Sequence, residues 1–364
     1  MYNLVCHLPD TIENHIVCEE TENLEQFELP NIHALKDING WDYFWYKRLK
    51  KLKIARRHPK LLVEVSRQNS VPILHSHFGH IGWQDVEAAR RAELKHVVSF
   101  YGWDVNSLPQ QKPYWRARYA ELFAHVNQVL CEGPYMAERI VDLGCPSDKI
   151  DVYHLGIAID KIAFKPRKWS PSEPLRVLIA ASFKEKKGIP YALEALGSLQ
   201  HRLPIEVTIV GDANYEKKSQ LEKQKILSVI DNHGLSSKVK MLGYQPYQNI
   251  FKEAYRHHVF ISPSVTASDG DTEGGAPVSL IEMAATGMPI VSTQHCDIPE
   301  VIHHNVTGLL AEERDVSGLV SHLEWLVNHP EKWQDMTMAG RKRVEAEYDA
   351  RLQGEKLAAI YLNL

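Results

Sequence analysis

Residues 259–293 hold the residue types that bind phosphate and sugar hydroxyls, in a spacing that could place them around one ligand. The segment reads as an apolar strand, a polar loop with Gly274 and Gly275, and a helix that begins at Pro277 and ends at Gly287. Glycines let a backbone approach a ligand closely, and the free N–H groups and dipole of a helix N-terminus attract an anion. The segment therefore predicts a diphosphate site where the helix begins.

Two glutamates flank this anion site. Glu273 lies in the loop just before the helix, and Glu282 lies in the second helical turn. A carboxylate has two acceptor oxygens, so each glutamate can accept hydrogen bonds from both hydroxyls of a ribose or a hexose. The two carboxylates and the phosphate-binding amides together indicate a nucleoside diphosphate sugar. The alternative is a glycine-rich turn between a strand and a helix, with acidic residues on its surface.

The same segment resembles the E-x7-E region of the retaining GT-B glycosyltransferases known as family 4, or group 1. Here Glu273 and Glu282 have eight residues between them instead of seven, and we expect the glycine loop to absorb the extra residue. The resemblance implies that Glu282 binds the ribose of the donor and that Glu273 contacts its sugar. The residues that it places around the donor are Gly274, Gly275, Ala276, Pro277, Val278 and Glu282.

Residues 180–196 resemble the strand, loop and helix that carry the diphosphate-binding lysine of this family. Lys187 matches that lysine, whose ammonium acts as a point charge. Ser182 stands where the family has a partner arginine, and we expect Lys184 or Lys186 to supply the missing charge. The donor-site residues that the resemblance adds are Ser182 and, near the nucleobase, Gly243 and Tyr244.

A strand in the amino-terminal half ends in the H-x-H pattern of the family. His77 matches the histidine that contacts the donor sugar, so the resemblance implies His77, Lys187 and Glu273 as the catalytic residues. Tyr101 stands where the family has another histidine. Judged without the family, His75 and His77 lie on one face of a strand and leave a metal site open, although no Cys or acidic residue lies at ligand spacing.

Asp269 and Asp271 have the D-x-D spacing of metal-dependent transferases. In a GT-B protein we expect them to form an ordinary polar loop. The resemblance therefore predicts no metal and no cofactor, with a UDP-, GDP- or ADP-sugar as the donor substrate.

Short apolar runs rich in β-branched residues alternate with helical patterns along the chain. This alternation predicts an α/β fold with parallel sheets and right-handed crossovers, in which buried strands are continuous apolar runs. The predicted strands are residues 15–17, 72–77, 96–100, 128–131, 151–155, 176–182, 206–211, 239–243, 259–264 and 289–293. The predicted helices include residues 115–127, 134–143, 190–200, 217–233 and 279–286.

The segment 161–175 has three prolines, several charges and no periodicity, which indicates a linker. The resemblance implies the GT-B architecture, with two Rossmann-like doubly wound domains facing across a cleft. We expect an acceptor-side domain over 1–160, without the usual first strand, and a nucleotide-sugar domain over 176–345. A final helix in 346–364 should cross back to the first domain.

The 364 residues carry 42 Lys and Arg against 46 Asp and Glu, a net charge of −4 at pH 7. This balance provides no basic field for nucleic acid. No apolar run reaches the ~18 residues of a membrane span, and the amino-terminal residues do not resemble a signal peptide. Five cysteines without a CxxC pair indicate a reducing compartment. We therefore expect a cytoplasmic protein that has no nucleic-acid partner.

Residues 41–57 combine aromatic side chains at helical spacing with seven basic residues. Aromatic residues and a basic face are typical of a helix that lies on a membrane surface, which would place the protein peripherally on the inner face of the membrane. The alternative is a helix docked on the sheet, with its charged face in solvent.

The sequence thus predicts a retaining, metal-independent glycosyltransferase of the hexosyltransferase type, active in polysaccharide or glycoconjugate biosynthesis. It would move a sugar from a nucleoside diphosphate to a glycan or lipid-linked acceptor. An inactive GT-B protein that binds nucleotide sugars or acts as a scaffold is the alternative. A dinucleotide oxidoreductase is disfavoured because no strand precedes a G-x-G-x-x-G motif, and a periplasmic binding protein is disfavoured because no signal peptide is apparent.

Overall fold

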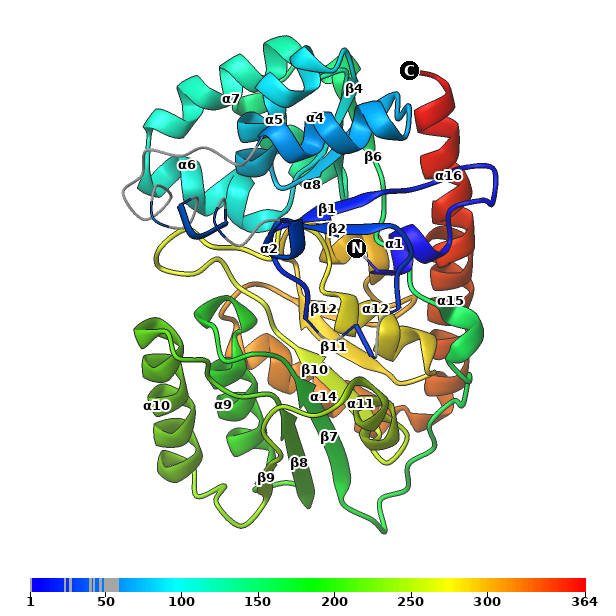
Figure 1. Cartoon of the computed structure of the whole chain (residues 1–364). Helices are drawn as coiled ribbons and strands as arrows, with labels where there is room; N and C mark the ends of the chain where they lie inside the picture. The colour runs from blue at the N-terminus through cyan, green and yellow to red at the C-terminus, as the bar shows by residue number, and fades with distance from the viewer. Residues whose placement is uncertain are drawn as a thin grey trace. The chain divides into compact units, whose positions relative to one another are not determined.

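The computed structural model describes residues 2–22, 24–25, 28–38, 41, 43–45, 48 and 59–364. The chain divides into two compact units (Figure 1). Unit 1 comprises residues 1–156 and 350–364, and unit 2 comprises residues 157–349. Each unit is built on a sheet of parallel strands, so the predicted α/β class with two Rossmann-like domains is confirmed.

Unit 1 contains a four-stranded parallel sheet in the order β3 (Ile73–His77), β4 (Lys95–Ser99), β5 (Gln128–Cys131), β6 (Ile150–Val152). A separate parallel pair joins β1 (Ile16–Cys18) to β2 (Ile32–Ala34). The helices of unit 1 are α1 (Tyr2–Cys6), α2 (Leu35–Ile38), α4 (Pro59–Gln68), α5 (Gly79–Arg91), the π-helical η1 (Trp103–Ser107), α6 (Leu108–Gln111), α7 (Tyr114–His125), α8 (Pro134–Asp142), η2 (Ser147–Lys149) and α16 (Ala350–Leu362).

The carboxyl-terminal helix α16 belongs to unit 1 and lies beside α1 (Figure 1). Just after α1 the chain approaches α16 so closely that a Cβ atom on Gly354 would lie 1.8 Å from the carbonyl oxygen of His7. Tyr361 reaches the sheet, where its hydroxyl lies 2.6 Å from Nδ1 of His75. The last residues of the chain therefore support the end of β3.

Unit 2 contains a six-stranded parallel sheet. The strand order is β12 (Leu309–Ala311), β11 (Ile290–Thr293), β10 (Val259–Ser262), β7 (Leu175–Ala180), β8 (Ile205–Val210), β9 (Val239–Met241). Read from β9, this is the doubly wound order 3-2-1-4-5-6, which reverses between β7 and β10. Ligands of such sheets bind at the carboxyl ends of the strands beside this reversal.

Helices and short helical turns precede, connect and follow the strands of unit 2 (Figure 1). They are η3 (Ile159–Lys161), η4 (Glu185–Lys187), α9 (Ile189–Leu199), α10 (Lys217–Asn232), α11 (Tyr247–Ala254), α12 (Val278–Ala285), α13 (Ile298–Val301), α14 (Val316–Asn328), η5 (Pro330–Lys332) and α15 (Trp333–Glu347). Strand residues such as Val177, Val259 and Ile290 have no exposed surface, which agrees with the continuous apolar runs expected of parallel strands.

The predicted strands are present, with shifted ends that have local causes. β10 ends at Ser262 because Pro263 has no N–H to donate. β9 ends at Met241, shortly before Gly243 turns the backbone to a φ of +65°. β2 and β12, of three residues each, were not among the predicted strands, although the equally short β1, β6 and β9 were.

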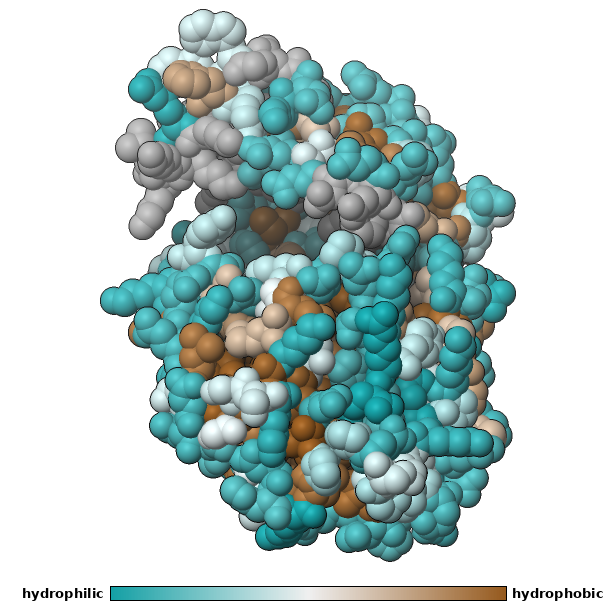
Figure 2. Space-filling model, turned by 90° about the horizontal axis from the view of Figure 1, so that it is seen from below, coloured by the Kyte–Doolittle hydropathy of each residue, from teal (hydrophilic) through white to brown (hydrophobic). Residues whose placement is uncertain are grey.

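Hydrophilic residues cover most of the face drawn in Figure 2, and apolar residues gather in patches among them. Within the described ranges, no helix has the length and apolar character needed to cross a bilayer. Most of the predicted membrane-surface segment, 41–57, lies outside the described residues. The side chains of Trp41, Phe44 and Trp45 are described, and at least half of each is exposed.

Candidate active site

The loops that follow β7 and β10 meet at the reversal point of the unit 2 sheet. Gly188 ends the loop after β7 with a φ of +63°, and a Cβ atom there would lie 1.8 Å from the carbonyl oxygen of Pro263. Only glycine fits this close approach. Lys187 is the last residue of η4 and directly precedes Gly188. The contact therefore brings Lys187 beside the loop after β10 that contains Glu273.

Lys187 and Glu273 form a largely buried ion pair. The Lys187 Nζ atom lies 2.8 Å from Oε2 of Glu273, and the two side chains are 18% and 6% exposed. The Ser264 hydroxyl donates to the other carboxylate oxygen at 2.8 Å. Burial raises the pKa of Glu273, but the charges of Lys187 and Lys186 and the hydrogen bonds outweigh it and hold the pKa below its ordinary value. The carboxylate is therefore ionised, and its remaining lone pairs can accept sugar hydroxyls.

The helix α12 begins at Val278, one residue after the predicted start, with Pro277 as its N-cap residue. Gly274 has a φ of +79°, which turns the chain into this helix. Among the residues that the structure describes, no acceptor is present for a group of backbone N–H donors at the helix entrance. They belong to Gly275, Ala276, Val278 and Ser279. These donors and the positive end of the helix dipole can hold an anion such as a diphosphate.

Glu282 is buried in the second turn of α12, with 5% of its surface exposed. The Tyr247 hydroxyl, at the start of α11, donates to its Oε1 atom at 2.5 Å. Burial raises the pKa of Glu282 to about 7, although the hydrogen bond from Tyr247 partly opposes this shift. The protonation of Glu282 therefore changes near neutral pH. Tyr247 was not among the predicted site residues, because nothing in a single sequence pairs it with a residue 35 positions away.

The predicted base-pocket residues lie beyond β9, which is next to β8 in the sheet. Gly243 accepts a hydrogen bond from the backbone N–H of Gly211 at 2.8 Å, which joins the loops after these two strands. Tyr244 is largely exposed and donates its hydroxyl to the carbonyl of Asp212 at 2.7 Å. Ser182, half-buried after β7, accepts a hydrogen bond from the backbone of Lys184 at its carbonyl.

The two lysines expected to replace the missing arginine differ in their contacts. Lys186 donates to the carbonyl of Thr272 at 2.7 Å and to Asp271 at 3.1 Å, so it holds the loop after β10. Lys184 is exposed and has no ion-pair partner within the described ranges. Lys184 is thus the one of the two that can approach a bound phosphate without breaking an existing contact.

The acidic residues with D-x-D spacing are both paired with lysines. Lys218 Nζ lies 2.7 Å from Asp269, and Lys186 pairs with Asp271. In the described parts of the chain, no group of three His, Cys, Asp or Glu residues could hold a metal ion.

His77 lies in unit 1, at the carboxyl end of β3. Its Nδ1 atom lies 2.7 Å from the Tyr101 hydroxyl, and its ring stacks on His75 with centroids 4.6 Å apart. Burial and the neighbouring histidines hold the pKa of His75 well below its ordinary value, so His75 is neutral. The Ser99 and Tyr361 hydroxyls bracket His75, so its polar atoms have partners within the protein.

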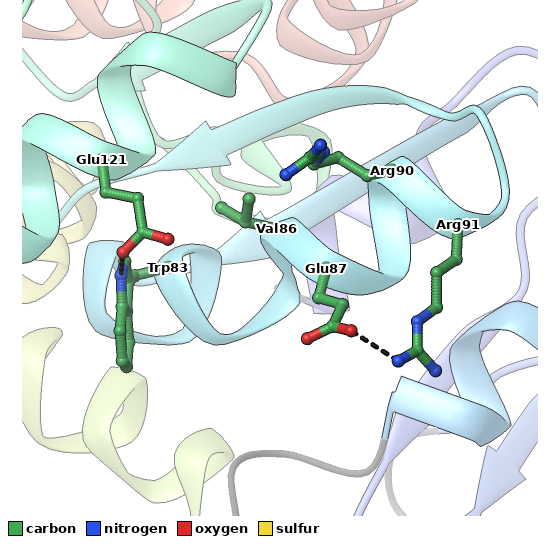
Figure 3. A pocket seen from close by; sticks show the side chains of 6 residues that line it. All are labelled: Trp83, Val86, Glu87, Arg90, Arg91 and Glu121. Atoms are coloured by element: carbon green, nitrogen blue, oxygen red, sulfur yellow. Dashed lines mark hydrogen bonds and ion pairs between the residues drawn. The ribbon is translucent and has the colours of Figure 1, made fainter.

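Unit 1 also contains a cavity of about 430 Å³ beside α5 and α7 (Figure 3). Two pairs of its lining residues bind each other: Trp83 donates its indole N–H to Glu121 at 2.7 Å, and Arg91 pairs with Glu87. None of the predicted donor-binding residues lines it. The lining residues are Trp83, Val86, Glu87, Arg90, Arg91 and Glu121.

Two parallel α/β units, one with a Rossmann strand order and a helix N-terminus rich in N–H donors beside its reversal point, have the features of the GT-B class. Comparisons with known proteins agree. The profile described as "Glycosyl transferases group 1" matches residues 160–343, and the profile "Glycosyltransferase Family 4" matches residues 1–161. The chain therefore belongs to the group 1 glycosyltransferases and is a glycosyltransferase.

Curated relatives cover most of the chain. The amylovoran biosynthesis glycosyltransferase AmsK of Erwinia amylovora is 32% identical over 305 residues, which span 83% of this chain and 72% of AmsK. The putative colanic acid biosynthesis glycosyltransferase WcaL of Escherichia coli K12 is 30% identical over 292 residues, 78% of this chain and 69% of WcaL. The solved structure of Anabaena HepE in complex with UDP and glucose has a TM-score of 0.74 and 16% identity, and covers 94% of this chain and 88% of HepE. This likeness shows the fold.

Proposed function

We propose that this protein is a retaining glycosyltransferase that moves a hexose from a nucleoside diphosphate to a glycan or lipid-linked acceptor in polysaccharide biosynthesis. The Lys187–Glu273 pair beside the N–H donors at the start of α12 carries the proposal, since a cation, a group of N–H donors and a carboxylate lie together at one sheet edge. The biosynthetic role is supported by the names of the relatives, which assign AmsK to amylovoran biosynthesis and WcaL, as a putative role, to colanic acid biosynthesis.

In this proposal the diphosphate binds the N–H groups at the start of α12 and shares the Lys187 ammonium with Glu273. The ribose hydroxyls bind Glu282, and the backbone near Gly243 and Tyr244 meets the base. When the bond between the sugar and the diphosphate breaks, negative charge develops on the departing phosphate. Preorganised donors and Lys187 stabilise that charge. Asp269 and Asp271 already form ion pairs with Lys218 and Lys186. Their carboxylates are thus paired with protein cations, which supports transfer without a metal ion.

Glu273 and His77 hold the sugar in the proposed reaction. Glu273 accepts hydrogen bonds from sugar hydroxyls on the lone pairs that Lys187 and Ser264 leave available. The acceptor hydroxyl attacks the anomeric carbon from the face that the nucleotide leaves, and its proton passes to the departing phosphate oxygen. The new bond then has the configuration of the old one, without a covalent intermediate on the enzyme.

A thermal-shift panel of UDP-, GDP- and ADP-glucose tests the donor site, because a ligand that binds the folded state raises the melting temperature. We expect one of the three sugar nucleotides to raise the melting temperature of the wild type. The same sugar nucleotide should not raise the melting temperature of Glu282→Ala. Glu222→Ala is the matched control, since Glu222 is another buried glutamate on a helix of unit 2. Stabilisation of Glu282→Ala equal to that of the wild type would refute the ribose role. Binding without donor turnover would favour an inactive binding protein.

We further propose that the segment 41–57 places the enzyme on the inner surface of a membrane, where it meets a lipid-linked acceptor. Support comes from the exposed aromatic side chains of Trp41, Phe44 and Trp45 and from the seven basic residues of the segment. Such a combination binds anionic lipid through both apolar burial and charge.

A further inference from the structure

The loop that carries Glu273 is held from outside by a histidine that has no part in the donor site described above. His295 follows β11 and is 1% exposed. Its Nε2 atom accepts a hydrogen bond from the backbone N–H of Glu273 at 3.1 Å. Its Nδ1 atom lies 2.6 Å from Oε1 of Glu313.

The neighbours of this ring define the hydrogen-bond role of each of its two nitrogens. The backbone N–H of Glu273 can only donate, so Nε2 must carry a lone pair. The Cys296 thiol lies 3.2 Å from the same nitrogen, and burial raises the pKa of Cys296 to about 12, so it too remains a donor. Glu313 faces Nδ1 as a carboxylate, because hydrogen bonds from His295 and Thr266 hold its pKa below the ordinary value despite burial. Nε2 is therefore the acceptor of the ring, and the ring proton lies on Nδ1, where it faces Glu313.

Glu313 also fixes the other end of the same loop. It accepts the backbone N–H of Thr266 at 2.8 Å and the Thr266 hydroxyl at 3.2 Å. Arg314 pairs with Glu313 and donates to the carbonyl of Thr266. One carboxylate thus reaches the beginning of the loop directly at Thr266, and its end at Glu273 through His295.

We propose that His295 and Glu313 form a positioning pair that sets the Glu273 backbone so that its carboxylate can meet the donor sugar. The proposal rests on the proposed function, in which Glu273 contacts the sugar. Lys187 and Ser264 hold only the carboxylate of Glu273. His295 is the side chain that holds its main chain, so it acts through Glu273 and does not touch the donor.

The test compares two substitutions of His295, each of which keeps the hydrogen bond of only one of the two ring nitrogens. His295→Asn places an amide near the Nδ1 position, where it can bind Glu313 but not reach Glu273. His295→Gln extends its carbonyl toward the Nε2 position, where it can accept from the Glu273 N–H. His257→Asn is the matched control, because His257 is also buried in unit 2 but lies before the amino end of β10 and binds the carbonyl of Glu253.

The readout is the affinity of each variant for UDP-, GDP- or ADP-glucose, whichever binds the wild type, and for the matching nucleoside diphosphate. We expect His295→Asn to lose about tenfold in affinity for the sugar nucleotide and in donor hydrolysis rate, as for one lost buried hydrogen bond. Its affinity for the nucleoside diphosphate should stay within about twofold. His295→Gln should recover part of the loss, and His257→Asn should show none of it.

Equal losses for the sugar nucleotide and the nucleoside diphosphate in His295→Asn would overturn the proposal, since they indicate a general structural defect. Unchanged affinities in His295→Asn would overturn it as well. If the wild type binds none of the three pairs, the donor site itself fails. The 15N chemical shifts of the His295 ring then test separately whether Nε2 accepts the backbone N–H of Glu273. A proton on Nδ1 alone supports the positioning pair, and a proton on Nε2 overturns it.

Discussion

Replacing Lys187 with methionine should destabilise unit 2, because Lys187→Met leaves the Glu273 carboxylate buried with Ser264 as its remaining side-chain donor. Removing one partner of a buried ion pair costs about 3–5 kcal/mol. The hydrogen bond from Ser264 and the nearby charge of Lys186 reduce this to about 2–3 kcal/mol here. Since each kcal/mol moves the melting temperature of a domain of 150–250 residues by about 2–4 °C, we expect a loss of roughly 4–12 °C.

Thermal melts of the two single variants and the double variant measure this effect. Glu273→Gln in the Lys187→Met background should recover most of the loss, because it removes the unpaired charge. The pKa of Glu273 lies below its ordinary value of 4.5. The Lys187–Glu273 ion pair therefore makes its full contribution to the stability of the wild type above that value, and this contribution is lost as pH falls through the lowered pKa. Wild type and Lys187→Met should therefore converge on acidification. Identical melting at pH 7, or no recovery in the double variant, would refute the reasoning.

Four other outcomes are expected. Burial raises the pKa of Glu282 to about 7, and its carboxylate must be ionised to accept the ribose hydroxyls, so nucleotide affinity should fall as pH drops below about 7. Tyr247→Phe removes the hydrogen bond that lowers this pKa, so it should move the transition to higher pH. Nucleotide-binding titrations at several pH values measure both effects. His77→Ala should slow transfer at least about tenfold with nucleotide affinity almost unchanged, and equal losses would indicate a folding defect. Asp269→Asn and EDTA treatment should leave the transfer rate unchanged, since Lys218 already pairs with Asp269; a rate restored only by added metal would contradict this. Replacing the seven basic residues of 41–57 with glutamine should abolish binding to anionic liposomes, each contributing about 1 kcal/mol, and persistent binding would refute the membrane proposal.

The local features of unit 2 were predictable because the residues that cause them are adjacent in the chain. Pro277 and Gly287 bound α12 in the sequence, and the structure places this helix between them. Continuous apolar runs predicted the parallel strands, since a strand buried on both faces has no polar alternation. The three-residue strands β2 and β12 were not predicted, although the equally short β1, β6 and β9 were.

The contacts that support the site were not predictable, because each joins residues far apart in the chain. The Tyr247–Glu282 hydrogen bond and the His295–Glu273 contact depend on how loops meet after the sheet has formed. Arg167 lies in the segment interpreted as a linker, yet it is 8% exposed. Its guanidinium donates to the carbonyls of Ala254 and His257 in unit 2, and proline content and charge gave no indication of this anchoring.

The most direct test of the donor site is a crystal structure of the protein with the sugar nucleotide selected by the thermal-shift panel. We expect the diphosphate within hydrogen-bond distance of Lys187 and of the N–H groups at the start of α12, with the ribose hydroxyls on Glu282. A nucleotide bound elsewhere, or a Glu282 carboxylate still bonded only to Tyr247 while the donor is present, would contradict it.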